Sequence, residues 1–474
     1  MSYLVKKWQP VIHITPSAVL VLVWSYLMYA HYVLISRFAD GSSTEVAPAT
    51  WYKYGFVIMA CFGYCFFPFL GLLADVWIGR YKAILIGIVL CFISWIIIGI
   101  GFIVDNYFDS EAILYSVYGF AYLFQFSGFS RFTANIIQYN IDQLVGASAE
   151  ELNSVIYWHI LSEPLMHFLF YLLQCLFYSS TYFIMITFIA SGVSVSLVLV
   201  SRSFFKHKLE NISLIKNPIK LIVRVLCYAR KHKYPENRSA LTYWEEEISS
   251  RLNLGKDKYG GPFTEEEVED VKTVFCMLPL FIGFVAFILS DDNYWSADKS
   301  FTLPTCLTVT DSQYYFHSVI VMLVYLFFIR VCFYKYIPSM LTRMSVGIFL
   351  AFIVTVSKVI IFVIERSHSD INSFRKLLFI AQTIQSISFI LFYPVSLEFT
   401  VAQSPVHMRG VMVGLWYATS WRFANFINTI LQFPFDSESQ YICTSFYYYI
   451  TKSVLVLIIL IVFVILAKCY TSIV

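Results

Sequence analysis

The sequence has little charge for its length. Asp, Glu, Lys and Arg make up 13% of its 474 residues, and the formal net charge at pH 7 is only +3. A soluble domain is about a quarter charged, so this shortage excludes an ordinary soluble protein, and the small net charge gives no reason to expect nucleic acid as a partner. Hydrophobic residues reach 59%, and the mean hydropathy is +0.70. We therefore predict an integral, multi-pass membrane protein whose surroundings are the lipid bilayer.

Two other signals are missing. No small-residue cleavage site follows the first apolar stretch, so we expect an uncleaved first helix and not a signal peptide. Cys61 and Cys65 share a helix face, but no further Cys or His accompanies them as a zinc site would require. We expect neither a metal site nor a cofactor. Cys306 and Cys443 fall in expected external loops, where they either pair or stay free.

Long hydrophobic runs are abundant. Twelve apolar windows have the length of about 20 residues that spans a bilayer. They lie at 15–36, 54–76, 82–104, 113–138, 152–177, 181–201, 272–291, 314–334, 344–365, 376–402, 408–433 and 446–468. A polar stretch separates six windows from the other six, a layout typical of secondary transporters. It predicts an all-α membrane protein with two six-helix halves (1–201 and 272–474) and a cytoplasmic linker (202–271).

The linker is the most basic part of the chain. The positive-inside rule therefore predicts that the linker and both termini lie in the cytoplasm, although the remaining cations are nearly balanced between the two sides of the membrane. Within it, Gly260, Gly261 and Pro262 end any preceding helix, and Thr264 with Glu267 matches a capping box. We predict a helix that begins at Thr264 and runs into the seventh span. It is either a plain connector or a brace that couples the two halves.

The stretch GLLADVWIGRYK, residues 71 to 82, joins the second and third spans on the expected cytoplasmic side. Gly71 and Gly79 permit a close helix approach and a tight turn. Asp75 and Arg80 supply charges for a breakable network that holds one gate, and the alternative is an ordinary charged loop. The stretch resembles the signature loop of the major facilitator superfamily. That resemblance implies a twelve-helix bundle whose halves rock to alternate access.

Three further stretches narrow the resemblance. The linker from 217 to 274, FTANIIQYNIDQL (132–144) and SLEFTVAQSPVHMRGVMVGLW (396–416) are similar to the proton-dependent oligopeptide transporter family, in its animal branch. The resemblance implies transport of a peptide-like or other nitrogen-containing solute, with protons as the candidate coupling ion. Glu398 occupies the place of the family's tenth-span glutamate, which meets the amino terminus of the substrate. We expect a monomer in the plasma membrane or an endolysosomal membrane.

The first span departs from that family. The family carries two glutamates and an arginine there, used for proton coupling and for the substrate carboxylate. The corresponding WSYLMYAHYV (24–33) has none of them and offers Tyr29, Tyr32 and His31. Arg131 is displaced by about two residues from the cationic position of the fourth span. Tyr32 remains a candidate for substrate binding.

The fifth span contains WHILSEPLMHF, residues 158 to 168. His159, Glu163 and His167 are four residues apart and share one helix face. Charge in hydrocarbon is costly and faces a partner or a water-filled path, and a carboxylate one turn away stabilises a charged histidine. These three are our candidates for proton coupling. Alternatively they satisfy one another between helices, or hold a cation with ligands that the sequence does not identify.

Two more charges lie deep in spans. Glu398 is seven residues before Pro405, about 10 Å inside the helix end at 1.5 Å per residue, a depth at which a glutamate is paired or faces a cavity. Arg422, in the eleventh span, either pairs with Glu398 or binds an anionic group of the substrate. With Tyr32 they complete the predicted substrate-binding set.

These features favour a secondary transporter over an enzyme. A membrane acyltransferase would also bury a histidine, but no second catalytic group accompanies it here. The stronger alternative is a transport-inactive sensor or scaffold derived from a peptide transporter. The missing first-span charges favour that alternative, and the intramembrane Glu, His and Arg disfavour it.

Overall fold

The computed structural model describes residues 14–43, 66–107, 111–144, 146–177, 182–205, 209, 217–231, 251–290, 310–367, 371–432 and 441–473. These residues form helices and turns, with one isolated bridge between Lys256 and Phe263. Cys61, Cys65, Cys306 and the side chain of Cys443 lie outside what the structure describes, so the predictions about them stay open.

The first group of helices corresponds to the first six expected spans. Its members are α2 (Pro16–Ser43), α4 (Phe67–Leu73), α5 (Arg80–Tyr107), α6 (Glu111–Asp142), α7 (Ala149–Phe177) and α8 (Phe183–Phe205). Between α4 and α5, a π-helical turn over Ala74–Ile78 ends at Gly79, whose φ is +88°. Residues with a Cβ rarely adopt that backbone angle, which explains why this turn of the predicted gate motif needs a glycine.

The linker region contributes α9 (Pro218–Lys231), two short 3-10 turns (Asn253–Gly255 and Asp257–Tyr259) and α11 (Glu265–Met277). The capping box is formed: the Thr264 hydroxyl accepts a hydrogen bond from the Glu267 backbone, and the Glu267 carboxylate accepts one from the Thr264 backbone. Through a 3-10 turn over Leu278–Ile282, α11 continues into α12 (Gly283–Ser290). The predicted helix start at Thr264 is confirmed.

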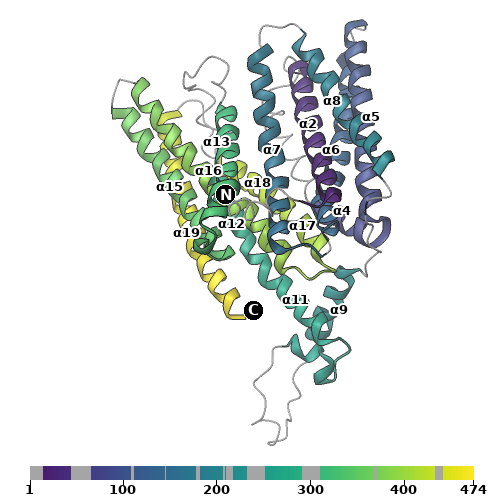
Figure 1. Ribbon diagram of the computed structural model, residues 1–474. Helices are drawn as coiled ribbons and strands as arrows, with labels where there is room; N and C mark the ends of the chain where they lie inside the picture. The colour runs from purple at the N-terminus through teal and green to yellow at the C-terminus, as the bar shows by residue number, and fades with distance from the viewer. Residues whose placement is uncertain are drawn as a thin grey trace, which may run out of the picture.

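The second group follows the linker. Besides α12 it contains α13 (Thr310–Val324), α14 (Arg330–Cys332), α15 (Met340–Ser367), α16 (Ile371–Gln403), α17 (Arg409–Tyr417), α18 (Ala424–Gln432) and α19 (Tyr441–Ile473). Two π-helical turns interrupt it, at Tyr325–Ile329 and Ala418–Phe423. Figure 1 shows the two groups side by side, with α9 and α11 at one end of the bundle, which we call the linker end.

Eight helices of the described residues are long and apolar enough to cross a membrane. The expected second, fourth, fifth and eleventh spans are not among them. Of the second, only the part from residue 66 is described. The helices α6 and α7 run for 32 and 29 residues, but buried polar side chains such as Gln125, Asn135 and Asn140 lower the hydropathy of α6. The prediction of an all-α membrane protein is confirmed, and the boundaries of its halves stay a prediction.

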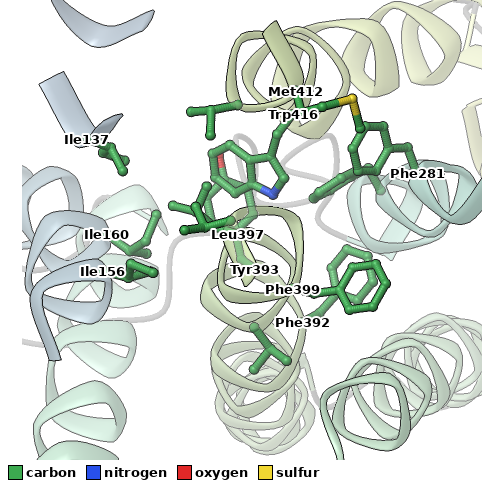
Figure 2. Close-up of a cluster of buried hydrophobic side chains, with 14 of the residues drawn as sticks. Ile137, Ile156, Ile160, Phe281, Phe392, Tyr393, Leu397, Phe399, Met412 and Trp416 are labelled. Carbon is green, nitrogen blue, oxygen red and sulfur yellow. The ribbon is translucent and has the colours of Figure 1, made fainter. Parts of the chain in front are cut away.

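Apolar side chains fill the space between the two groups. Figure 2 shows Ile137, Ile156 and Ile160, from α6 and α7, facing Leu397 and Trp416, from α16 and α17. The contact depends on shape and not on the hydrophobic effect, since lipid is as apolar as these side chains. Such a contact can separate and re-form without exposing polar groups to lipid.

Candidate functional site

A small cavity lies where the two groups meet, and five helices contribute to its wall. The lining residues are Tyr29 (α2), His159, Ile160, Glu163 and Pro164 (α7), Tyr315 (α13), Phe389 and Tyr393 (α16), and Tyr417 (α17). Its volume is about 30 Å³, and one water needs about 10–15 Å³ on the same measure. In this conformation it holds about two waters, so an organic solute enters only when the groups part.

The helix α7 brings two of the predicted coupling residues to this cavity. Glu163 and His159 both line it, one helical turn apart. Glu163 is half-buried and is followed by Pro164, whose missing N–H leaves the carbonyl of Ile160 without its helical donor. His159 is 3% exposed, and its Nε2 lies 2.7 Å from Nδ2 of Asn140 on α6. The two titratable side chains of α7 that line the cavity, Glu163 and His159, thus lie where the two groups meet.

The third residue of the predicted ladder lies elsewhere. The His167 ring stacks on Tyr315 of α13, with ring centroids 4.4 Å apart and planes 15° apart. Phe168 contacts Phe316 of α13, and Tyr157 stacks on Tyr325, the first residue of the π-helical turn that follows α13. Aromatic rings therefore join α7 to α13 over much of their length, and Tyr315 belongs both to this seam and to the cavity wall.

The predicted gate residues form a buried network at the linker end. Arg80 Nε donates to Asp75 Oδ1 and Arg80 Nη1 donates to Asp142 Oδ2 of α6, each over 2.6 Å. Gln138 Nε2 donates to the other oxygen of Asp142. Asp142 belongs to the fourth-span motif, and sequence reasoning did not identify it as the second partner of Arg80.

Glycines let this network touch the second group of helices. A Cβ on Gly71 of α4 would lie 2.8 Å from the carbonyl oxygen of Gly410 on α17, and one on Gly414 would lie 2.9 Å from the oxygen of Phe67. A Cβ on Gly410 itself would collide with the Asp75 carboxylate. The helices α4 and α17 are therefore as close as backbones allow, which closes the linker end here.

Glu398 is paired and does not line the cavity. It is 7% exposed, and its carboxylate accepts hydrogen bonds from Arg343 Nη2 at 3.3 and 3.4 Å and from Asn153 Nδ2 at 3.0 Å. Arg343 also donates to the hydroxyls of Tyr157 and Tyr325. Arg343 and Glu398 belong to the second group and Asn153 and Tyr157 to the first, so this cluster ties the groups together.

A second arginine, Arg330 on α14, also joins the second group to α7. Arg330 Nη1 donates to the Ser154 hydroxyl over 2.9 Å, and Nη2 donates to the backbone oxygen of Glu150 over 2.6 Å. Both acceptors lie near the start of α7. The linker end is thus held by two arginines on one side and by the Asp75–Arg80–Asp142 network on the other.

The remaining predicted residues have varied surroundings. The Tyr32 ring stacks on Phe129 at 4.2 Å, and Arg131 donates to Ser127 on its own helix. His31 is fully buried between Gln125 of α6 and Ser191 of α8. The backbone of Arg422 lies in the π-helical turn after α17, and its side chain is outside what the structure describes.

Sequence reasoning missed Lys452. This lysine on α19 is 1% exposed, and its Nζ lies 4.4 Å from the centroid of the Tyr448 ring. A cation over an aromatic face is stabilised by the ring quadrupole. The tyrosine one turn earlier on the same helix was the signal that could have found it.

Ion pairs hold the linker together, and one of them reaches the connection between α16 and α17. Lys256 binds the carboxylates of Glu265 and Glu269 at 2.9 and 2.6 Å. Burial alone would lower the pKa of Lys256, but these carboxylates outweigh it and hold that pKa above its ordinary value. Further along α11, Asp270 lies 3.5 Å from His407, in the connection between α16 and α17.

Comparison with known proteins identifies the relatives of this fold. The chain is similar to the crystal structure of the POT family transporter PepTSo, with a TM-score of 0.70 over 96% of this chain and 98% of that chain, at 14% identity. An auto-inhibited POT family peptide transporter matches with a TM-score of 0.65 over 95% and 96%, at 15% identity. The proton:xylose symporter XylE of the major facilitator superfamily matches with a TM-score of 0.56 over 94% of each chain, at 13% identity.

Two of these relatives are transporters and the third is a symporter, and their folds confirm the major facilitator architecture. The family model described as PTR2, POT family, matches residues 166–441. That match spans the linker, the tenth-span Glu398 stretch and more than half of the 474 residues. The protein therefore belongs to the POT family of transporters.

Proposed function

We propose that this protein is a secondary transporter that moves a small organic solute by alternating access through the cavity between the two helix groups. One observation carries the proposal: helices of both groups line one cavity, and a carboxylate belongs to its wall. A site so placed opens to either side when the groups rock. The names of the relatives, which include a peptide transporter, support a peptide-like or other nitrogen-containing solute.

Two sets of contacts act as gates in this proposal. At the linker end, the glycine contact of α4 with α17 and the Arg330 and Arg343 clusters hold the groups together. Toward the other end, His167 and Tyr315 stack directly beside the cavity. Each rocking movement would break one set while the other stays closed.

Glu163 and His159 are the proposed proton-coupling residues. Both line the cavity, and His159 contacts Asn140 of α6. Asn140 lies two residues before Asp142, the partner of Arg80 in the gate. A proton that changes the charge next to His159 therefore acts on a helix that also carries the linker-end gate.

Glu398 keeps its proposed role in substrate binding only on one condition. Its carboxylate is shared between Arg343 and Asn153, so a substrate amine must displace one of them. Such a displacement would also loosen the tie between the groups. Substrate binding by Glu398, Tyr32 and Arg422 would thereby be linked to gate opening.

The orientation of the protein and the membrane that contains it are also part of the proposal. The basic linker favours cytoplasmic termini, which makes the linker end the cytoplasmic end. The plasma membrane and an endolysosomal membrane are both compatible with this orientation. We propose that the monomer is the functional unit, since one chain supplies both walls of the cavity.

Uptake into proteoliposomes tests the proposal. A pool of peptides, amino acids and organic ions is offered with and without a proton gradient, to the wild-type protein and to Glu163→Gln and Glu398→Gln. We expect gradient-driven uptake that Glu163→Gln abolishes. Glu150→Gln is the control, because that exposed carboxylate belongs to the same helix and lies far from the cavity wall.

The alternative function has a distinct outcome. If well-folded protein takes up nothing from the pool, the transport proposal is wrong and the sensor or scaffold alternative stands. Uptake that ignores the gradient in every variant retains transport but rejects proton coupling through Glu163.

A further inference from the structure

We infer that His159 is a solute-binding residue of the cavity: its neutral ring donates a hydrogen bond from Nδ1 to an acceptor oxygen of the solute, a carboxylate or a carbonyl. This inference rests on the proposed transport function and makes the role of His159 in it more specific. The histidine holds the solute, while the coupling proton changes the charge of the cavity wall next to it.

The two ring nitrogens of His159 have different surroundings. Nε2 lies 2.7 Å from Nδ2 of Asn140 on α6, and α6 contributes no described residue to the wall of the cavity. Nδ1 has no hydrogen-bond partner among the described residues, although His159 is only 3% exposed and lines the cavity. Nδ1 is therefore the ring nitrogen that remains for a ligand in the cavity.

The contact with Asn140 determines where the proton of the ring lies. An amide nitrogen can only donate, so Nε2 accepts from Nδ2 and carries no hydrogen. The proton of the neutral ring is then on Nδ1. If the Asn140 amide were turned round, its N–H2 group would replace Oδ1 as the atom without a partner among the described residues, and a buried N–H is the costlier group to leave unpaired.

The other polar groups of the wall do not accept this proton. They are the Glu163 carboxylate on the same helix and the hydroxyls of Tyr29, Tyr315, Tyr393 and Tyr417 on neighbouring helices. No hydrogen bond joins any of them to Nδ1. A buried donor without a partner is costly, and an oxygen of a bound solute removes that cost. The site therefore favours a solute that presents an acceptor oxygen to α7.

The same surroundings keep the ring neutral. A charged ring would need a hydrogen on Nε2, where the Asn140 N–H2 group already lies at 2.7 Å. No carboxylate of the described residues hydrogen-bonds to the ring, and a buried charge without such a partner is unfavourable. A neutral donor keeps its hydrogen bond to the solute whether or not the coupling proton is present.

Nitrogen NMR of the full-length protein with isotopically labelled histidine tests the state of the ring. The nitrogen shifts distinguish the two neutral tautomers from each other and from the charged form, and His159→Gln identifies the signals of this residue. We expect the tautomer with its proton on Nδ1 from about pH 5 to pH 8. A proton on Nε2, or a ring that becomes charged within this range, would overturn the inference.

Three solutes that share a phenyl ring and an amine test the chemistry of the ligand. Phenylalanine has a carboxylate, phenylalaninamide has a carbonyl, and 2-phenylethylamine has no acceptor oxygen. Equilibrium binding to the purified protein should be at least about tenfold weaker for 2-phenylethylamine than for phenylalanine. Tighter binding of phenylalanine than of its amide assigns a carboxylate, and equal binding assigns a carbonyl. Equally tight binding of 2-phenylethylamine contradicts the inference.

Two substitutions separate solute binding from proton transfer and from packing, and neither new side chain titrates. His159→Asn places an amide N–H2 group where Nδ1 lies, whereas His159→Gln places its amide where Nε2 lies and keeps a partner for Asn140. For each solute that the wild type takes up, His159→Gln should raise the apparent KM about tenfold for a carboxylate, or about two- to tenfold for a carbonyl, with little change in kcat. His159→Asn should stay near the wild type. Melting temperatures should follow the opposite order, because only His159→Asn gives up the contact with Asn140.

The uptake results separate this inference from the proposed function. An equal loss of gradient-driven uptake in both variants would assign the proton to His159, and a KM that follows the melting temperature would assign a packing role; either result rejects the inference. Uptake that both variants leave unchanged assigns Nδ1 to a structural water, which rejects the inference and leaves the proposed function intact. No transport of any solute by well-folded protein rejects both.

Discussion

The contact of α4 with α17 makes a quantitative prediction for Gly71→Ala. The new methyl group would lie 2.8 Å from the carbonyl oxygen of Gly410 and 3.4 Å from its carbon. Both are backbone atoms, so no side chain can rotate away and the helices must separate. Overpacking of this kind costs about 1–3 kcal/mol.

That cost falls on one conformation only. In the proposed linker-open state α4 and α17 would be apart, and the methyl group would meet no backbone. The equilibrium should therefore shift toward the linker-open state by about 5- to 150-fold, the factor that corresponds to about 1–3 kcal/mol. A conformation that is rare in the wild type would become readily measurable.

Distance measurements between spin labels detect the shift. Labels replace Trp77 and Val406, which are 74% and 71% exposed at the linker end on the first and second groups, after the native cysteines have been replaced. We expect a longer-distance population in Gly71→Ala. The control is Gly119→Ala on α6, where an added Cβ meets nothing within 4 Å. An unchanged distance distribution in Gly71→Ala, or an equal change in Gly119→Ala, would refute the reasoning.

Two further predictions concern ion pairs. Arg343→Gln leaves the buried Glu398 carboxylate without its cation and should lower the free energy of unfolding by about 3–5 kcal/mol. The double variant with Glu398→Gln should recover part of that loss. Thermal melting of purified protein measures both, and an Arg343→Gln protein that melts like the wild type contradicts the buried pair. Lys256→Met removes a pair with Glu269 that contributes up to about 1 kcal/mol. Because the pKa of Lys256 is raised above its ordinary 10.5, its stabilisation is complete below pH 10.5 and is lost as the pH rises through the folded-state pKa. Melting temperatures of wild type and variant should therefore converge at strongly alkaline pH, and parallel curves would show that the pair does not stabilise the fold.

Local signals in the sequence predicted the helices well. The capping box at Thr264 depends on residues three apart, so the sequence alone contains all of its parts. The positive φ of Gly79 likewise belongs to one residue in a recognisable turn. The apolar window at 113–138 located α6. That helix is not among the eight that are apolar enough to cross a membrane, because it contains side chains such as Asn135 and Gln138, which find hydrogen-bond partners on their own helix and are buried despite their polarity.

Partners that are distant in the sequence could not be predicted. Glu398 pairs with Arg343, which is 55 residues away on another helix, and Arg80 reaches Asp142 across 62 residues. Periodicity gives the face of a helix on which a charge lies but not which helix it meets. The predicted ladder on α7 shows the same limit. Its residues do share a helix, yet His167 contacts Tyr315 while His159 contacts Asn140.

The choice between a transporter and a scaffold depends on Glu163 more than on Glu398. The Glu398–Arg343 pair is explained by the packing of helices alone, and a scaffold needs such ties as much as a transporter does. Glu163 lies in the wall of a cavity that helices of both groups line, where a carboxylate adds desolvation cost to the folded state. Where a residue serves function at the expense of stability, replacing it usually makes the protein more stable. Glu163→Gln should therefore melt at the wild-type temperature or higher while transport is lost, whereas in a scaffold its loss would change no solute flux.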